Sequence, residues 1–120
     1  MAFADPIALT IGGATKNLVR VDSGRFASEY RLVEALQEFS LVIRNQDVKP
    51  EQDGRRKQRH NISFRQRIFA TATTPEIVRE SSVVISHYAG DDVTAFDDGA
   101  IAVAGMVTVA NVAKLANFES

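Results

Sequence analysis

The sequence predicts an α+β protein in which an antiparallel sheet precedes a pair of helices. Segments of strand length with alternating polar and apolar residues recur from Ile7 to about Tyr88, separated by short runs with glycine, proline or charged residues. After Gly90 the chain becomes alanine-rich and loses this alternation. Strands followed by helices are typical of α+β folds, and 120 residues suffice for one domain.

The first two strands form a hairpin. The segments "IALTI" and "KNLVRVD" flank "GGAT", and a glycine turn between two short alternating runs is a common signature of a β-hairpin. The run "IGGATK" lacks the full spacing of a P-loop or a dinucleotide fingerprint, so a phosphate-binding loop is the weaker interpretation. The segment "GRFASEYRL" predicts a third strand to about Leu32, although "EYRLVEALQEF" is also compatible with a helix.

Two longer strands follow and are predicted to pair. In "FSLVIRNQD", Phe39, Leu41 and Ile43 share one face, which is the pattern of a half-buried strand. The loop "VKPEQDGRRK" leads into residues 58–69, "QRHNISFRQRIF", where apolar residues lie at even positions and arginines at odd ones. The even face comprises His60, Ile62, Phe64, Gln66 and Ile68, and the odd face comprises Arg59, Asn61, Ser63, Arg65 and Arg67.

The last strand and the helices complete the domain. "TATTPE" predicts a loop, and "IVRESSVVISHY" predicts a strand whose centre, "VVI", is too apolar for an exposed edge. Carboxylates from Asp91 onward and Lys114 near the end suit helix termini, and Gly105 is the predicted break. We expect a single domain over residues 1–120, with a hairpin at 1–23, the main sheet at 24–90 and the helices at 91–120.

The net charge of −1 conceals an uneven distribution. Between Arg44 and Arg67 the chain has eight basic residues against three acidic ones, whereas from Ala89 onward it has five acidic residues and one lysine. Such asymmetry favours one surface that meets a polyanion. Because arginine makes paired hydrogen bonds to phosphate and stacks on bases, the sequence predicts RNA binding by the odd face. A merely solvated sheet face is the competing explanation.

Other functions find less support in the sequence. The absence of cysteine excludes disulfides and thiolate chemistry. No signal peptide is predicted, and "AIAVAGMVTVA" is about half the length that a bilayer requires, so we expect no membrane partner. Neither of the two histidines, His60 and His87, has a metal-binding spacing, and His60 is expected to be a hydrogen-bonded histidine on the core side.

No nucleophile, base and orienting group combine into a catalytic site. We therefore expect no enzyme, no small-molecule substrate and no cofactor. The pairs Asp91/Asp92 and Asp97/Asp98 could bind calcium at subunit contacts, although helix capping explains them more simply.

Six segments in order along residues 9–91 carry a resemblance to a known family: "LTIGGATK", "SEYRL", "VKPEQ", "RHNISF", "TPEIVR" and "VVISHYAGD". Taken together they resemble the coat proteins of small single-stranded RNA bacteriophages, the levivirus-like phages, and look closest to the coat of the phage type that infects Caulobacter. The specificity lies in the ordered set of segments, because none of them is a chemical signature by itself.

The resemblance implies an N-terminal hairpin, a five-stranded antiparallel sheet and two C-terminal helices. It also implies an intertwined dimer, in which two sheets join edge to edge and the helices of each subunit cover the partner's sheet. Such dimers form an icosahedral (T=3) capsid in the bacterial cytoplasm, with the uncovered sheet face against the genomic RNA. Family members typically also bind an RNA hairpin, which represses replicase translation and marks the genome for packaging.

Carried over by position, the resemblance and the charge pattern together predict an RNA-binding set on the uncovered face. The set comprises Arg44, Gln46, Lys57, Arg59, Asn61, Ser63, Arg65 and Arg67. Ser40 belongs to the same face. Glu80 and Ser82 could join it from the last strand, whose two faces are too similar in sequence to fix its orientation. The loop residues Arg55, Arg56 and Lys57 are expected to reach phosphate. A small dimeric RNA-binding regulator that does not assemble is the alternative function, and a hydrolase or metal enzyme is a third class for which no catalytic residues were found.

Overall fold

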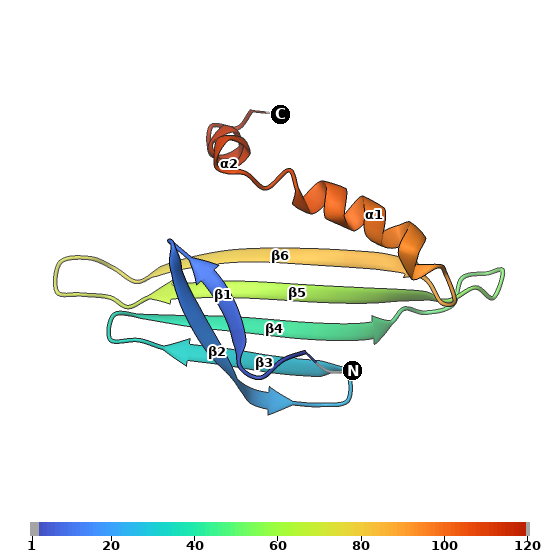
Figure 1. Ribbon diagram of the computed structural model, residues 1–120, viewed down its shortest axis with the longest axis horizontal. Helices are drawn as coiled ribbons and strands as arrows, with labels where there is room; N and C mark the ends of the chain where they lie inside the picture. Colours follow the sequence, from blue (N-terminus) through green and yellow to red (C-terminus); the bar gives the residue numbers. More distant parts are fainter. Residues whose placement is uncertain (1–2, 120) are drawn as a thin grey trace.

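The computed structural model describes residues 3–119 and shows six strands followed by two helices (Figure 1). The strands are β1 (Ile7–Ile11), β2 (Ala14–Ser23), β3 (Ala27–Val33), β4 (Gln37–Asp47), β5 (Lys57–Ile68) and β6 (Ile77–Tyr88). The helices are α1 (Val93–Ala104) and α2 (Val109–Ala116). The predicted α+β order is confirmed, and the helical alternative for residues 29–39 is wrong because β3 and β4 occupy nearly all of that segment.

The strands pair antiparallel in the order β1-β2-β3-β4-β5-β6, so the sheet within residues 3–119 has six strands instead of the expected five. The difference arises from β2, whose first half pairs with β1 and whose second half, after Leu18, pairs with β3. A β-bulge between Arg20 and Asp22 bends this strand. The hairpin turns at Gly12 and Gly13, whose φ angles of 61° and 80° explain why glycine stands at both positions.

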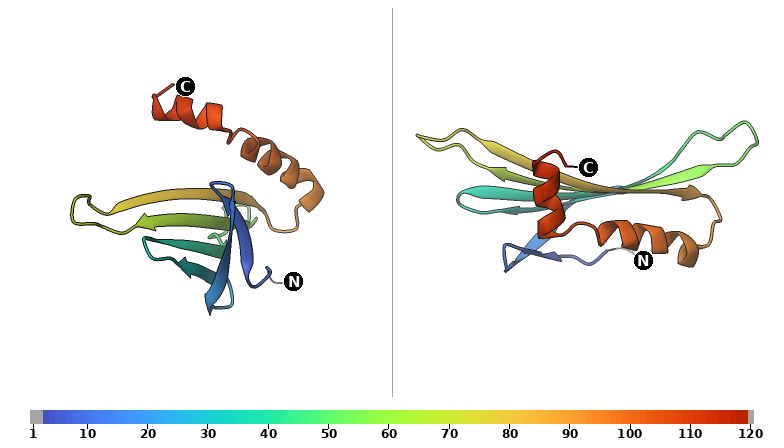
Figure 2. Two further views of the ribbon diagram at one scale, coloured as in Figure 1. Left: turned by 60° about the vertical axis from the view of Figure 1, so that its left-hand side comes forward. Right: turned by 90° about the horizontal axis from the view of Figure 1, so that it is seen from above.

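The hydrophobic core lies between the hairpin and one face of β3 and β4. Figure 2 shows the hairpin and α1 on the same side of the sheet, while the opposite side is bare. Residues of β1 and the aromatic ring of Phe64 pack around the buried cluster from the outside. The cluster itself consists of Leu18, Tyr30, Phe39, Leu41 and Ile43.

Two polar contacts fix the hairpin on the sheet. Arg20 donates to the hydroxyl of the fully buried Tyr30 from Nε at 3.2 Å and from Nη2 at 2.7 Å, and this hydrogen bond raises the pKa of the guanidinium. Lys16 donates to the carboxylate of Glu34, in the β3–β4 turn, at 2.9 Å. That hydrogen bond is the main cause that lowers the pKa of Glu34.

The bare side of the sheet is the polar face, formed by the odd positions of β3 and β5 and the even positions of β4 and β6. The register settles the orientation of the last strand, which its sequence left open, because Arg65 faces Glu80 and Ser63 faces Ser82. The charged and hydrogen-bonding residues of the polar face are Glu29, Arg31, Glu38, Ser40, Arg44, Gln46, Lys57, Arg59, Asn61, Ser63, Arg65, Arg67, Glu80, Ser82, Ser86 and Tyr88.

The helical segment consists of two short helices, and the break between them begins at Gly105, as the sequence predicts. The carboxylate of Asp92 accepts from the N–H of Thr94 at 3.0 Å and caps α1, which ends at Gly105, the predicted break. Thr108 caps α2 through the N–H of Asn111 at 3.2 Å. Within residues 3–119 no single helix is long and apolar enough to cross a membrane; α1 and α2 meet that test together, with a bend of 67° between them.

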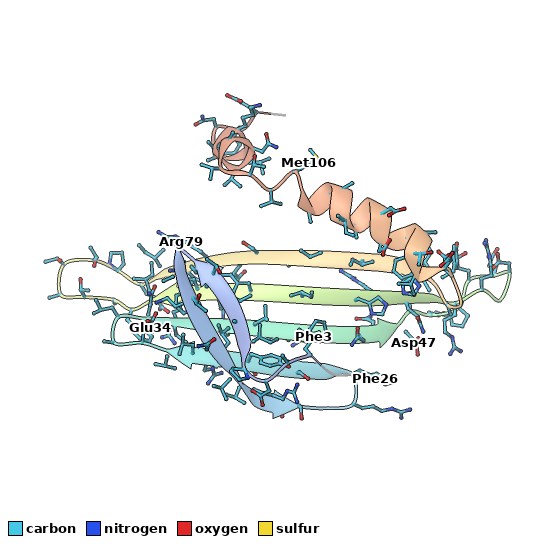
Figure 3. All side chains as sticks on the ribbon, in the orientation of Figure 1. Phe3, Phe26, Glu34, Asp47, Arg79 and Met106 are labelled. Atoms are coloured by element: carbon cyan, nitrogen blue, oxygen red, sulfur yellow. The ribbon has the colours of Figure 1, made fainter. Side chains whose placement is uncertain are left out.

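The ring of Phe96, in the first turn of α1, stacks on His87 of β6. Beyond that contact the helices leave the sheet, and the link that carries Met106 lies away from every strand (Figure 3). Their apolar side chains are consequently exposed: Val109 is 92% accessible, Leu115 69% and Ile101 67%. The chain as a whole exposes 9163 Å², whereas a compact protein of 13.1 kDa exposes roughly 6,400 Å². Its radius of gyration is 17.3 Å, against roughly 13.6 Å for a compact chain of this length.

Candidate nucleic-acid interface

The register brings all eight residues of the predicted RNA-binding set to the polar face. Arg44 lies opposite Asn61, Gln46 opposite Arg59, and Ser63 between Val42 and Ser82. Side chains on one face of adjacent strands are close enough to contact one ligand together. The set is therefore contiguous over β4 and β5, although its members differ in what they already bind.

Most arginines at one end of the polar face are already paired with carboxylates. We call this the paired end, and it lies beside the β3–β4 turn. Arg65 Nε is 3.0 Å from Glu80, and Arg67 contacts Glu76 and lies 3.8 Å from Glu38. The carboxylate already offsets the charge of such an arginine and repels an approaching phosphate, so the pair attracts phosphate less than an unpaired arginine does.

Arg31, on β3, belongs to the same network. Its guanidinium lies 2.9 Å from Glu29 and 3.0 Å from Glu38. Glu38 thus contacts two arginines, and its side chain is 18% exposed, the lowest of these carboxylates. The paired end is close to neutral, and its ion pairs link neighbouring strands from β3 through β6.

The other end of the polar face, beside the β4–β5 loop, is different. We call it the basic end, and Arg44 and Arg59 are its principal residues. Both are exposed, and within residues 3–119 neither has a carboxylate within 4.0 Å. Arg59 and Arg65 are six residues apart on β5, about 20 Å at strand spacing, so the two ends could contact different parts of a bound polyanion.

Polar side chains between the two ends form hydrogen bonds that leave donors for a ligand. Ser63 Oγ donates to Asn61 Oδ1 at 2.6 Å, which leaves the Nδ2 group of Asn61 without a partner among the described residues. A shallow depression of about 500 Å³ lies beside them on the polar face. Its polar lining comprises Glu29, Ser40, Arg44, Ser63, Arg65, Glu80, Ser81 and Ser82.

The β4–β5 loop folds back on the end of β6. Arg55 lies over the ring of Tyr88 with its guanidinium carbon 4.4 Å from the centroid, and the Tyr88 hydroxyl donates to Glu51 at 3.1 Å. Lys57 is 3.6 Å from Glu51. Arg55 also binds Asp53 at 2.5 Å, and its backbone N–H and guanidinium lower the pKa of that carboxyl.

This folding leaves few loop cations without a carboxylate. Lys49 and Arg56 are exposed and have no ion pair within residues 3–119. Together with Arg44 and Arg59 they make four cations at the same end of the molecule that carry no local counter-charge.

Sequence reasoning missed Glu29 and Glu38 among the carboxylates of the paired end and left the side of Glu80 open. The segment from Arg44 to Arg67 has only three acidic residues, but Glu29, Glu38 and Glu80 come from β3, β4 and β6. Their alternation with the arginines across strands is visible in the sequence only when the register is known.

The remaining candidate residues are placed apart from the polar face. His60 and His87 lie on the side of the sheet opposite the polar face, which also carries the hairpin and which we call the covered face. They contact each other there, and His60 is half-buried and hydrogen-bonded as expected. Asp97 and Asp98 lie inside α1 instead of capping it. Within residues 3–119 no group of three or more histidine, aspartate or glutamate side chains could hold a metal ion.

Comparison with known proteins agrees with this geometry. The family model described as "Phage phiCb5, coat protein" matches residues 4–88, which span the hairpin and all of the sheet. No curated protein sequence matches the chain. The matched segment ends at the last residue of β6 and leaves out the exposed helices. Because the match covers well over half of the chain, this protein belongs to the phage phiCb5 coat protein family and is a capsid protein.

Proposed function

We propose that this coat protein dimerises through β6 and its helices, assembles into a closed icosahedral shell, and binds genomic RNA on the polar face. The observation that carries the proposal is a bare sheet face with uncompensated cations on a chain that cannot bury its own apolar surface. Dimerisation, RNA binding and assembly each rest on separate features.

The exposed apolar surface supports dimerisation. Each chain exposes about 2,800 Å² more than a compact protein of its mass, so two chains could bury about 5,600 Å² together, at the upper end of obligate interfaces. β6 is a twelve-residue edge strand, and Val83 and Val84 at its centre are 48% and 44% exposed. A second copy that pairs antiparallel along β6 would cover this edge by two-fold symmetry and remove a site of aggregation.

The position of the helices supports an intertwined arrangement. A groove of about 410 Å³ separates α1 from β6 and is lined by apolar residues including Val83, Ile85, Phe96 and Val103. The helices extend past the β6 edge, on the side where a partner's sheet would continue (Figure 1). In a dimer each pair of helices would therefore cover the half of the partner's sheet that the hairpin leaves open.

RNA is the polyanion that suits the polar face. Arg44 and Arg59 offer planar donors to phosphate, and the Nδ2 of Asn61 offers a donor to a base edge or a sugar. A face that spans two joined sheets would contact an RNA segment on both sides of the dimer axis. Recognition of one RNA hairpin, with repression of translation, would require contacts to base edges in addition to these phosphate contacts.

Light scattering combined with RNA addition tests the proposal. For protein released from particles, or refolded without RNA, the molar mass measured by light scattering should be twice the subunit mass of 13.1 kDa. Added single-stranded RNA should convert this dimer to particles visible by electron microscopy. A dimer that binds RNA and never assembles would favour the small RNA-binding regulator. A stable monomer of 13.1 kDa would contradict dimerisation.

A further inference from the structure

His60 of β5 and His87 of β6 form a contact on the covered face that the functions above do not use. Their Nε2 atoms lie 2.7 Å apart, and their rings are nearly parallel at 17°. The outer nitrogens are also occupied: His60 Nδ1 lies 2.6 Å from Asn45 Oδ1, and His87 Nδ1 lies 2.8 Å from the carbonyl oxygen of Tyr88. Four ring nitrogens therefore take part in three hydrogen bonds.

The number of protons in this chain of hydrogen bonds follows from the acceptors. The Tyr88 carbonyl and Asn45 Oδ1 can only accept, so both Nδ1 atoms must carry a proton. A neutral imidazole has one N–H, so two neutral rings would place two lone pairs against each other at 2.7 Å. One additional proton turns this contact into an N–H···N hydrogen bond, and a second additional proton would make it repulsive again.

The surroundings favour one positive charge on the pair. Asp47 lies on the same face of β4, two residues beyond Asn45, and accepts from Gln58 at 3.3 Å. Asp91 and Asp92 stand where the chain leaves β6 for α1.

Cations are few on this side. Arg79 is the only arginine or lysine at the described covered-face positions of β4, β5 and β6, and it lies at the end of the sheet opposite Asp47 (Figure 3). Arg25, in the β2–β3 turn, lies 4.9 Å from the ring of Phe26, whose carbonyl accepts from the N–H of Asn45. The cations of β5 lie on the polar face: Lys57, Arg59, Arg65 and Arg67. Among these charged groups on the histidine side of the sheet, carboxylates therefore outnumber cations.

The pair also connects the sheet to the helices. The ring of Phe96, in the first half of α1, stacks on His87 at 4.2 Å with an angle of 7°. Farther along, the groove of about 410 Å³ separates α1 from β6. The His87 ring is therefore in direct contact with the first turn of α1, where the chain leaves the sheet.

We propose that His60 and His87 share a single proton between their Nε2 atoms, and that this proton holds α1 in the direction required for pairing with a second subunit. Loss of the shared proton at high pH and gain of a second one at low pH both separate the rings and release Phe96. Subunit association then has a pH optimum with a fall on each side. The effect on association rests on the dimer proposed above, whereas the shared proton does not.

Imidazole ¹⁵N NMR at neutral pH tests the shared proton directly, and the chain has only these two histidines to assign. We expect three N–H groups on the two rings at neutral pH and two after the alkaline transition. Two N–H groups at neutral pH would overturn the proposal. In that case the Asn45 amide is rotated so that its Nδ2 donates to His60 Nδ1, and both rings are neutral. The Asn45→Asp variant supplies a charged acceptor and should move the alkaline transition to higher pH.

The coupling to association needs a second measurement. The dimer dissociation constant of the native protein should rise about 30-fold on each side of the optimum, the value of one lost hydrogen bond in each of the two subunits. The His87→Gln variant should show a flat profile, and Phe96→Leu should flatten it while leaving the three N–H groups in place. A flat native profile with three N–H groups would refute the coupling alone, and a protein that stays monomeric would refute the proposed dimer and leave the NMR result standing.

Discussion

Replacing both unpaired arginines of the polar face, Arg44→Gln with Arg59→Gln, should weaken RNA binding and flatten its salt dependence. Each arginine that contacts a phosphate of single-stranded RNA releases counterions and contributes a slope of about −0.7 in log K against log salt. Loss of two contacts should therefore reduce the slope by about 1.4 and lower the affinity at 0.1 M salt about 25-fold. Fluorescence anisotropy of a short labelled RNA at several salt concentrations measures both quantities.

A matched control is available at the paired end. The double variant Arg65→Gln with Glu80→Gln removes one ion pair, of 3.0 Å, and leaves the net charge unchanged. Its slope should equal that of the native protein, because Arg65 is already neutralised by Glu80. The Arg44→Lys with Arg59→Lys variant should keep the slope and lose only part of the affinity, since lysine retains charge without the paired hydrogen bonds.

Either of two results would refute this division of the polar face. An unchanged slope after loss of Arg44 and Arg59 would mean that RNA binds elsewhere. A slope reduced equally by the Arg65 and Glu80 control would mean that phosphate displaces Glu80, and that the paired end is part of the RNA site.

Three further results are expected. Leu115→Asp should raise the dimer dissociation constant, measured by light scattering, at least about a hundredfold, because Leu115 is 69% exposed in one subunit and would be buried by a second. An unaffected dimer would contradict the proposal that the helices of each subunit cover the partner's sheet. Leu18→Ala should lower the free energy of unfolding in urea by about 2–5 kcal/mol, since this fully buried side chain joins the hairpin to the core. Glu34→Gln should destabilise the protein at neutral pH, because the hydrogen bond from Lys16 lowers the pKa of Glu34. The stability that this ion pair contributes is complete above the ordinary pKa of 4.5 and disappears as pH falls through the lower pKa of the folded protein. The urea midpoints of the native protein and the variant should therefore converge in acid.

Much of the fold could be predicted because alternation along a strand is a local property. The two faces of β5, the β4–β5 hairpin and the helix break at Gly105 all follow from residues close in sequence. The dual role of β2 did not follow, since nothing in "KNLVRVD" marks the residue at which its partner changes from β1 to β3.

The candidate site was predicted as a surface but not as an arrangement of charges. The few acids close to Arg65 in the sequence suggested a uniformly basic face. The strand register, however, places Glu80 of β6, fifteen residues later in the chain, beside Arg65. Interactions across strands depend on register, and register depends on the whole fold. The histidine pair was hidden for the same reason, because His60 and His87 are 27 residues apart and meet only in the sheet.

Electron cryo-microscopy of particles purified from expressing cells tests the central claim most directly. We predict closed shells in which the polar face lines the interior, paired β6 strands form the subunit contact, and RNA density lies against Arg44 and Arg59. Shells with the polar face outward, or with RNA density only against the helices, would contradict the account.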